Sequence, residues 1–116
     1  TFQWKLADKG TAGNPAIDTI TDFDKTQTTG DKLDLRDLLQ GENKNDLTNL
    51  DNYLHFEKSG ADTVVKVSSS GQFVTGFDNT KVDQTIILKN VDLVGSFTTD
   101  QQVLQDMLNK NQLQTD

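Results

Sequence analysis

The sequence predicts a mainly β protein that ends in one α-helix, and three observations support this prediction. Short apolar runs with period-two alternation recur along most of the chain, and polar turn residues separate them. Of the 18 acidic residues, 16 are Asp and two are Glu. Asp is a poor helix former that favours turns and caps. Only the last segment has the spacing of an amphipathic helix.

The first strand is expected at residues 1–6, where Phe2, Trp4 and Leu6 fall on one face. Because Thr1 then stands in mid-strand, we expect the parent protein to continue upstream of it. Residues 8–16 contain glycines and the single proline, and this composition predicts a loop.

A second strand is expected at residues 17–23, but its alternation is imperfect. Asp18 and Asp22 share a face with the apolar Ile20. A polar turn follows. Residues 32–39 then predict a short strand that passes into a helical turn.

The middle of the chain predicts a loop and three strands. Residues 41–52 are polar and Asn-rich, which predicts a loop with room for one helical turn. Residues 53–58 and 63–68 predict the strands of a β-hairpin, joined by a turn at 59–62. Residues 84–89 predict a further strand.

Residues 99–110 predict the C-terminal helix. Thr99 and Gln102 have the spacing of a capping box, and Asp100 suits the first turn because negative charge is favourable at a helix N-terminus. The apolar stripe consists of Val103, Leu104, Met107 and Leu108. The simplest role for such a helix is to cover a β edge.

Length and composition exclude several classes of protein. A chain of 116 residues suits a single domain, 1–116, with a modest core. Its formal net charge of -7 argues against nucleic-acid binding and against docking on anionic lipid. The absence of cysteine excludes disulfides and thiol nucleophiles. No apolar run reaches the roughly 18 residues that span a membrane, and no signal-peptide pattern occurs at the N-terminus.

Catalytic signatures are absent from the sequence. The single histidine, His55, falls in a predicted strand, and a lone strand histidine is more often a surface or rim residue than a catalytic one. No P-loop, nucleophile elbow or HExxH motif occurs. We therefore expect this protein not to be an enzyme.

The Asp residues include one local cluster of candidate calcium ligands. Calcium prefers six to eight oxygen ligands from carboxylates and loop carbonyls. The cluster surrounds one predicted turn and consists of Asp18, Asp22, Asp24 and Asp31. Ion binding explains the broken apolar face beside Ile20, and so does a strand end exposed to water. The spacing alone leaves both explanations open.

The same region carries a family resemblance. Residues 18–23 read Asp-Thr-Ile-Thr-Asp-Phe, and residues 30–35 read Gly-Asp-Lys-Leu-Asp-Leu. They resemble the segment that follows the last nonapeptide repeats in RTX proteins, including serralysin-type proteases. The whole chain is similar to the type I secretion C-terminal target domain of large repetitive RTX adhesins. Further matching segments are 4–8, 35–42, 53–58, 84–88 and 91–93.

The resemblance implies a fold and a set of ligands. The fold would be the end of a calcium β-roll running into a β-sandwich-like cap with the C-terminal helix. Residues 1–40 would form the β-roll-like calcium segment, 41–98 the β cap, and 99–110 the helix and secretion-signal region. The implied Ca²⁺ ligands are Asp18 and Asp31, with Asp24 and Asp8 as weaker additions.

The resemblance also implies a function, that of a non-enzymatic, calcium-binding module of a monomeric adhesin for cell adhesion and biofilm formation. Its partners would be the upstream RTX repeats and the type I machinery, an ABC transporter and a membrane fusion protein, which would export it to the cell surface. No intact Gly-Gly-x-Gly-x-Asp repeat occurs here, so most calcium ions would lie upstream.

Three alternatives stay open at this point, and the simplest is a purely structural β domain without metal. The chain could be the tail domain of a secreted RTX enzyme. It could also be a carbohydrate- or surface-binding module that uses an aromatic platform. The aromatic residues available for such a platform are Trp4, Tyr53, Phe73 and Phe77. Because aromatic residues are few in this chain, we expect these four to belong to the core.

Overall fold

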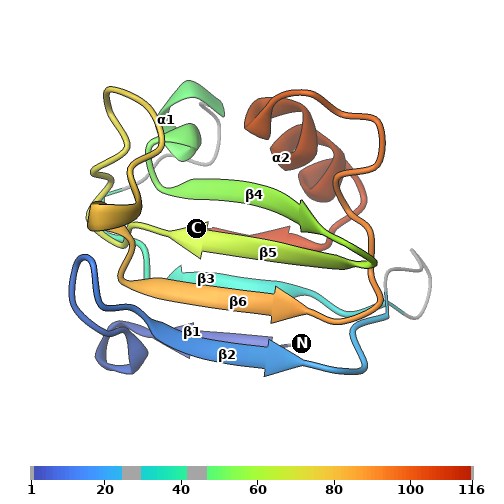
Figure 1. Cartoon of the computed structure of the whole chain (residues 1–116), viewed down its shortest axis with the longest axis horizontal. Coiled ribbons are helices and arrows are strands. Elements are labelled where there is room, and N and C mark those ends of the chain that lie inside the picture. Colours follow the sequence, from blue (N-terminus) through green and yellow to red (C-terminus); the bar gives the residue numbers. More distant parts are fainter. Residues whose placement is uncertain (1, 25–29, 42–46, 116) are drawn as a thin grey trace.

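The computed structural model describes residues 2–24, 30–41 and 47–115. Within these ranges the chain forms seven strands in two sheets and a C-terminal helix (Figure 1), which confirms the predicted mainly β fold. No helix among the described residues is long and apolar enough to cross a bilayer.

The smaller sheet has three parallel strands. They are β1 (Phe2–Lys5), β3 (Leu33–Asp37) and β7 (Leu113–Gln114), in the order β1-β3-β7. Leu33 lies opposite Phe2 on one side and Leu113 on the other. The first and last described strands therefore share one sheet.

The larger sheet combines parallel and antiparallel pairs. Its strands are β2 (Ala16–Ile20), β6 (Gln84–Leu88), β5 (Asp62–Val67) and β4 (Leu54–Ser59), in the order β2-β6-β5-β4. The pair β2/β6 is parallel, whereas β6/β5 and the hairpin β5/β4 are antiparallel. The hairpin predicted around residues 59–62 is therefore confirmed.

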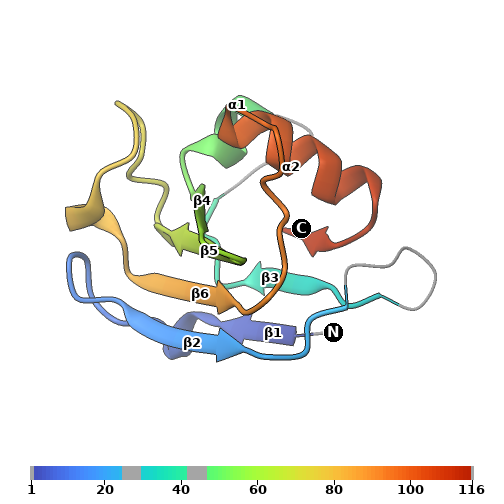
Figure 2. The same ribbon diagram turned by 45° about the vertical axis from the view of Figure 1, so that its right-hand side comes forward.

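The chain path alternates between the two sheets at the start of the fold. It runs from β1 into β2 in the other sheet and returns to β3, which pairs with β1 in parallel. Figures 1 and 2 both show β1 and β2 together at the lower end of the molecule, each as an edge strand. The helices α1 (Leu47–Asp51) and α2 (Asp100–Asn109) lie at the opposite end, beside β4.

A single apolar cluster joins both sheets and α2. Leu33 and Leu35 of β3, Ile86 and Leu88 of β6, and Leu104 of α2 are completely buried in it. Each such side chain contributes roughly 1.5–3 kcal/mol relative to an exposed one. The capping box predicted at Thr99 and Gln102 is present and fixes the start of α2 on this core.

Several predicted elements differ from the observed ones. The first strand ends at Lys5, and Leu6 lies in the 3₁₀ turn η1 (Leu6–Asp8) with its side chain 40% exposed, so it does not share the face of Trp4. The second strand starts at Ala16 and ends at Ile20. The side chain of Ile17 is 63% exposed, because it projects from the outer face of an edge strand.

One short helical element was predicted, and two other short elements were not. The helix α1 is the helical turn expected in residues 41–52. The two unpredicted elements are the 3₁₀ turn η2 (Asn79–Lys81), between β5 and β6, and the strand β7 after α2. A two-residue strand has no detectable period. It forms because β3 offers it an unpaired edge.

Candidate functional site

The four predicted calcium ligands lie in two places. Asp18, on β2, accepts hydrogen bonds from Trp4 Nε1 at 3.0 Å and from Gln84 Nε2 at 2.9 Å. Its carboxylate therefore connects the edge strand β1 to β2 and β6. This contact explains the polar residue beside Ile20, because the buried indole N–H of Trp4 needs an acceptor.

Asp24 and Asp31 are joined by two hydrogen bonds. The backbone N–H of Asp31 donates to the carbonyl of Asp24 at 2.6 Å, and the backbone N–H of Asp24 donates to Asp31 Oδ2 at 2.9 Å. The residues between them, 25–29, lie outside the described part of the chain. The observed role of this pair is to bring the end of one segment to the beginning of the next.

Asp8 and Asp18 share a hollow between the edge strands β1 and β2. The hollow has a volume of about 610 Å³, and Asp22 is a third carboxylate in its lining. The Asp8 carboxylate also accepts the backbone N–H of Lys5 at 2.8 Å. In the described ranges, no three His, Cys, Asp or Glu side chains are grouped closely enough to hold a metal ion. Calcium ligation by these residues therefore stays a prediction.

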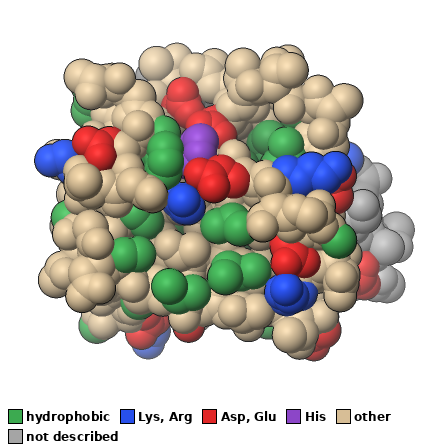
Figure 3. Space-filling view, in the orientation of Figure 1, with side chains coloured by type: hydrophobic (Ala, Val, Ile, Leu, Met, Phe, Trp, Pro, Cys, Tyr) green, Lys and Arg blue, Asp and Glu red, His purple; other side chains and the backbone are tan. Residues whose placement is uncertain are grey.

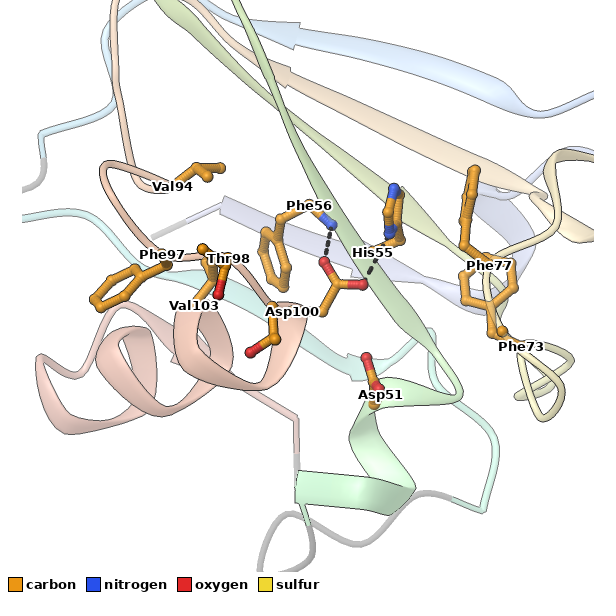
Figure 4. A pocket seen from close by; sticks show the side chains of 12 residues that line it. Asp51, His55, Phe56, Phe73, Phe77, Val94, Phe97, Thr98, Asp100 and Val103 are labelled. Atoms are coloured by element: carbon orange, nitrogen blue, oxygen red, sulfur yellow. Dashed lines mark hydrogen bonds and ion pairs between the residues drawn. The ribbon is translucent and has the colours of Figure 1, made fainter.

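A second constellation surrounds His55 on β4. Its Nδ1 lies 2.8 Å from Asp100 Oδ2, and its Nε2 lies 3.0 Å from Glu57 Oε2. The other oxygen of Asp100 accepts the backbone N–H of Phe56 at 2.9 Å (Figure 4). Asp100 is the first residue of α2, so these contacts attach the helix to the edge strand β4.

The carboxylates around His55 determine its protonation. Burial disfavours the charged imidazolium, but the hydrogen bond and charge of Asp100 and the charge of Glu57 outweigh it and raise the pKa of His55. Glu57 also pairs with Lys66 Nζ at 3.3 Å. Both ring nitrogens of His55 therefore have carboxylate partners. We call the group of His55, Glu57 and Asp100, which attaches α2 to β4, the tether.

A cavity of about 390 Å³ lies beside this tether, between β4, α2 and the loop that precedes η2. Phe77 stacks on the His55 ring with centroids 3.8 Å apart, and Phe73 meets Phe77 edge-on at 5.3 Å. Asp51 at the end of α1 and Phe97 before α2 complete the walls (Figure 4). Figure 3 shows the histidine among acidic and apolar side chains on this face.

Sequence reasoning did not find this second constellation. His55 was correctly placed on a strand rim, and Asp100 was correctly placed in the first turn of the helix. No signal in the sequence joins two residues 45 positions apart. The alternation that puts His55 and Glu57 on the same strand face was the only available clue.

The aromatic residues mostly belong to the core, as expected. Trp4, Tyr53 and Phe73 are buried, and Phe77 is the only member of the proposed aromatic platform with an exposed ring. These four residues therefore do not form a flat surface for a carbohydrate.

Comparison of the chain with models of protein families, with curated proteins and with solved structures finds no match. The described residues form a two-sheet β module with an open end at β1 and β2 and a helix-covered end at β4.

Proposed function

We propose that this chain is a non-enzymatic, calcium-assisted end module of a larger RTX-type protein exported by a type I system to the cell surface. The observation that carries the proposal is the pair of open parallel edges. β1 and β2 are edge strands of different sheets, lie at the same end of the molecule, and follow each other along the chain. Upstream β-roll repeats that alternate between the two sheets as β1 and β2 do would add one parallel strand to each of these edges.

The opposite end of the molecule suits a terminal position in such a stack. There the sheet finishes in an antiparallel hairpin, and Asp100 of α2 accepts the N–H that Phe56 offers at the edge of β4. Repeat arrays need a terminal unit whose outer face no longer pairs with another repeat. The asymmetry between the two ends therefore supports a cap.

The carboxylates at the open end support a role for calcium there. Asp8, Asp18 and Asp22 line the hollow between β1 and β2. One carboxylate oxygen of Asp8 and one of Asp18 already accept hydrogen bonds, so the three residues would supply fewer than the six to eight oxygens that calcium takes. The remaining ligands would come from loops of the preceding turn. Asp24 and Asp31, which are hydrogen-bonded to each other, would be a second place where calcium acts.

The mechanism follows from charge. At low intracellular calcium, clustered carboxylates repel each other and the folded state is weakly populated, which suits passage through an exporter. Outside the cell, bound calcium neutralises them, and its binding free energy adds to folding stability. The region 99–110 would carry the export signal for the transporter and its fusion protein.

Thermal unfolding with and without calcium tests this proposal. At a calcium concentration about tenfold above the Kd, stability rises by about 1.4 kcal/mol, which raises Tm by about 5 °C. Asp18→Asn and Asp31→Asn, which keep one acceptor oxygen each, should lose most of this rise. Asp106→Asn, where the acid pairs with Lys110 on α2, is the matched control and should keep it.

Isothermal titration with calcium on the same variants separates binding from stability. A melting temperature identical in EGTA and in millimolar calcium, together with no binding heat, would refute the calcium part of the proposal. Full binding in both Asp18→Asn and Asp31→Asn would refute the site assignment.

A further inference from the structure

The loop at residues 73–77 lines the cavity beside the tether, and we call this loop the strap. Its sequence, Phe-Val-Thr-Gly-Phe, contains no charged residue. Phe73 is buried, and its backbone N–H donates to the carbonyl of Asn52 at 2.9 Å, so this end of the strap is fixed. Residues 74–76 are exposed. The outer part of the strap therefore depends on the contacts that Phe77 makes with the larger sheet.

Two side chains that can carry positive charge lie against the ring of Phe77. The imidazole of His55 stacks on this ring with centroids 3.8 Å apart (Figure 4), and Lys66 Nζ lies 5.3 Å from the ring centroid. The face of an aromatic ring attracts a cation electrostatically, whereas a neutral imidazole keeps only the stacking contact. The strap is therefore held more strongly when His55 is protonated.

The two carboxylates of the tether do not suit the neutral form of His55. A protonated ring donates from both nitrogens, to Asp100 at 2.8 Å and to Glu57 at 3.0 Å. A neutral ring has one N–H, so a lone pair on its other nitrogen would face a carboxylate. Asp100 is also held by the N–H of Phe56, whereas the side chain of Glu57 is 39% exposed and is free to turn away. Because Glu57 pairs with Lys66 at 3.3 Å, its movement also displaces the second cation of the strap's attachment.

The charged groups that face His55 come from four elements. They are Asp100 of α2, Glu57 of β4, Lys66 of β5 and Asp51 of α1. Burial lowers the pKa of His55, but the hydrogen bond and charge of Asp100 and the charge of Glu57 outweigh it, and the pKa is raised. The change between the two forms of the ring therefore occurs above the ordinary value of about 6.5.

We propose that the strap is a pH-dependent wall of this cavity. While His55 is protonated, Phe77 holds the strap against the larger sheet. When His55 loses its proton, the strap detaches and the cavity opens to solvent. The residues involved lie at the helix-covered end, so the proposal does not depend on calcium at the open end.

Nuclear magnetic resonance of the intact, ¹⁵N-labelled chain tests this proposal. The Cε1–H signal of the single histidine gives the titration of His55, and ¹⁵N relaxation gives backbone order parameters at both ends of that titration. The order parameters of Thr75 and Gly76 should be about 0.85 in the protonated form and below about 0.6 in the neutral form. Val65 of the central strand β5 is the reference and should stay at about 0.85 in both.

Three variants locate the effect. His55→Gln has no cationic form, so its strap should have low order parameters that do not depend on pH. Phe77→Leu keeps an apolar contact but removes the ring, and should give the same low values although His55 still titrates. Phe97→Leu is the matched control, because Phe97 lines the same cavity and is exposed to a similar degree, 36% against 38% for Phe77. It should keep the full pH response.

Three outcomes would overturn the proposal. One is equal order parameters of Thr75 and Gly76 at both ends of the wild-type titration. Another is a pH response of wild-type size in His55→Gln or in Phe77→Leu. The third is a fall at Val65 together with the strap, which would indicate loosening of the whole fold.

Discussion

At the scale of single residues, Gly71 illustrates how closely the backbone approaches the core. Its φ is 72°, a left-handed conformation, and a Cβ placed there would lie 2.8 Å from the ring of Tyr53. Tyr53 cannot easily move away, because its hydroxyl donates to the carbonyl of Gln40 at 2.6 Å. The glycine is therefore required both for its conformation and for its lack of a side chain.

Gly71→Ala should destabilise the protein by about 2–4 kcal/mol, since strain in the left-handed region adds to a steric clash with a buried ring. The matched control is Gly60→Ala, where φ is 60° but no atom lies within 4 Å of the new Cβ. Its cost should be only about 1 kcal/mol. Urea denaturation measures the free energy of unfolding of both variants. Equal losses of stability would contradict the proposed role of the contact with Tyr53.

His55 predicts a dependence of stability on pH. Its folded-state pKa is raised, so the imidazolium is better stabilised in the folded chain than in the unfolded chain. This contribution is fully present below the ordinary unfolded value of about 6.5 and is lost as pH rises through the raised folded value. The groups that face His55 are Asp100 of α2, Glu57 of β4, Lys66 of β5 and Asp51 of α1.

Thermal melts between pH 5.5 and 9 should therefore show Tm falling with rising pH above about 6.5. His55→Gln should remove most of this slope, because His55 is the only histidine in the chain. Stability that rises over the same interval in the wild type would contradict the assignment.

At the scale of elements, Asp100 combines three roles at the start of α2. It is an acid in the first helical turn, it pairs with His55, and it accepts the N–H of Phe56 on the edge strand. The apolar side chains Val103, Leu104 and Met107 of the helix are buried against the core. Here a carboxylate also satisfies one of the polar groups that the edge exposes.

Asp100→Ala should destabilise the protein by about 1–3 kcal/mol, because it leaves the Phe56 N–H without its acceptor and removes the helix-terminal charge. The control is Asp106→Ala in the same helix, which loses only the surface pair with Lys110 and should cost under about 1 kcal/mol. Hydrogen exchange adds a local readout, since the Phe56 amide should exchange faster in Asp100→Ala alone. Unchanged protection of that amide would contradict the proposed role.

At the scale of the whole molecule, local patterns predicted the elements, but not their partners. The alternation at 53–58 and 63–68 and the capping box at Thr99 depend on neighbours in sequence, and both appear as expected. The exposure of Ile17 and the two residues of β7 depend on which strands lie at the edges of the sheets, and edges are a property of the assembled fold. Likewise, Asp18 interrupts the apolar alternation of its strand because its carboxylate accepts the indole N–H of Trp4. The sequence shows the interruption but not this contact.

The pairing of β7 with β3 has a consequence for how fast this chain folds. Leu113 pairs with Leu33, 80 positions earlier, and Thr85 pairs with Ile17 across 68 positions. Such contacts give a high contact order, and their loop-closure entropy must be overcome before the contacts provide any stability. The local hairpin of β4 and β5 forms in microseconds when isolated, whereas a topology dominated by distant pairs folds in milliseconds to seconds. Registration of the three-stranded sheet is therefore the expected rate-limiting event.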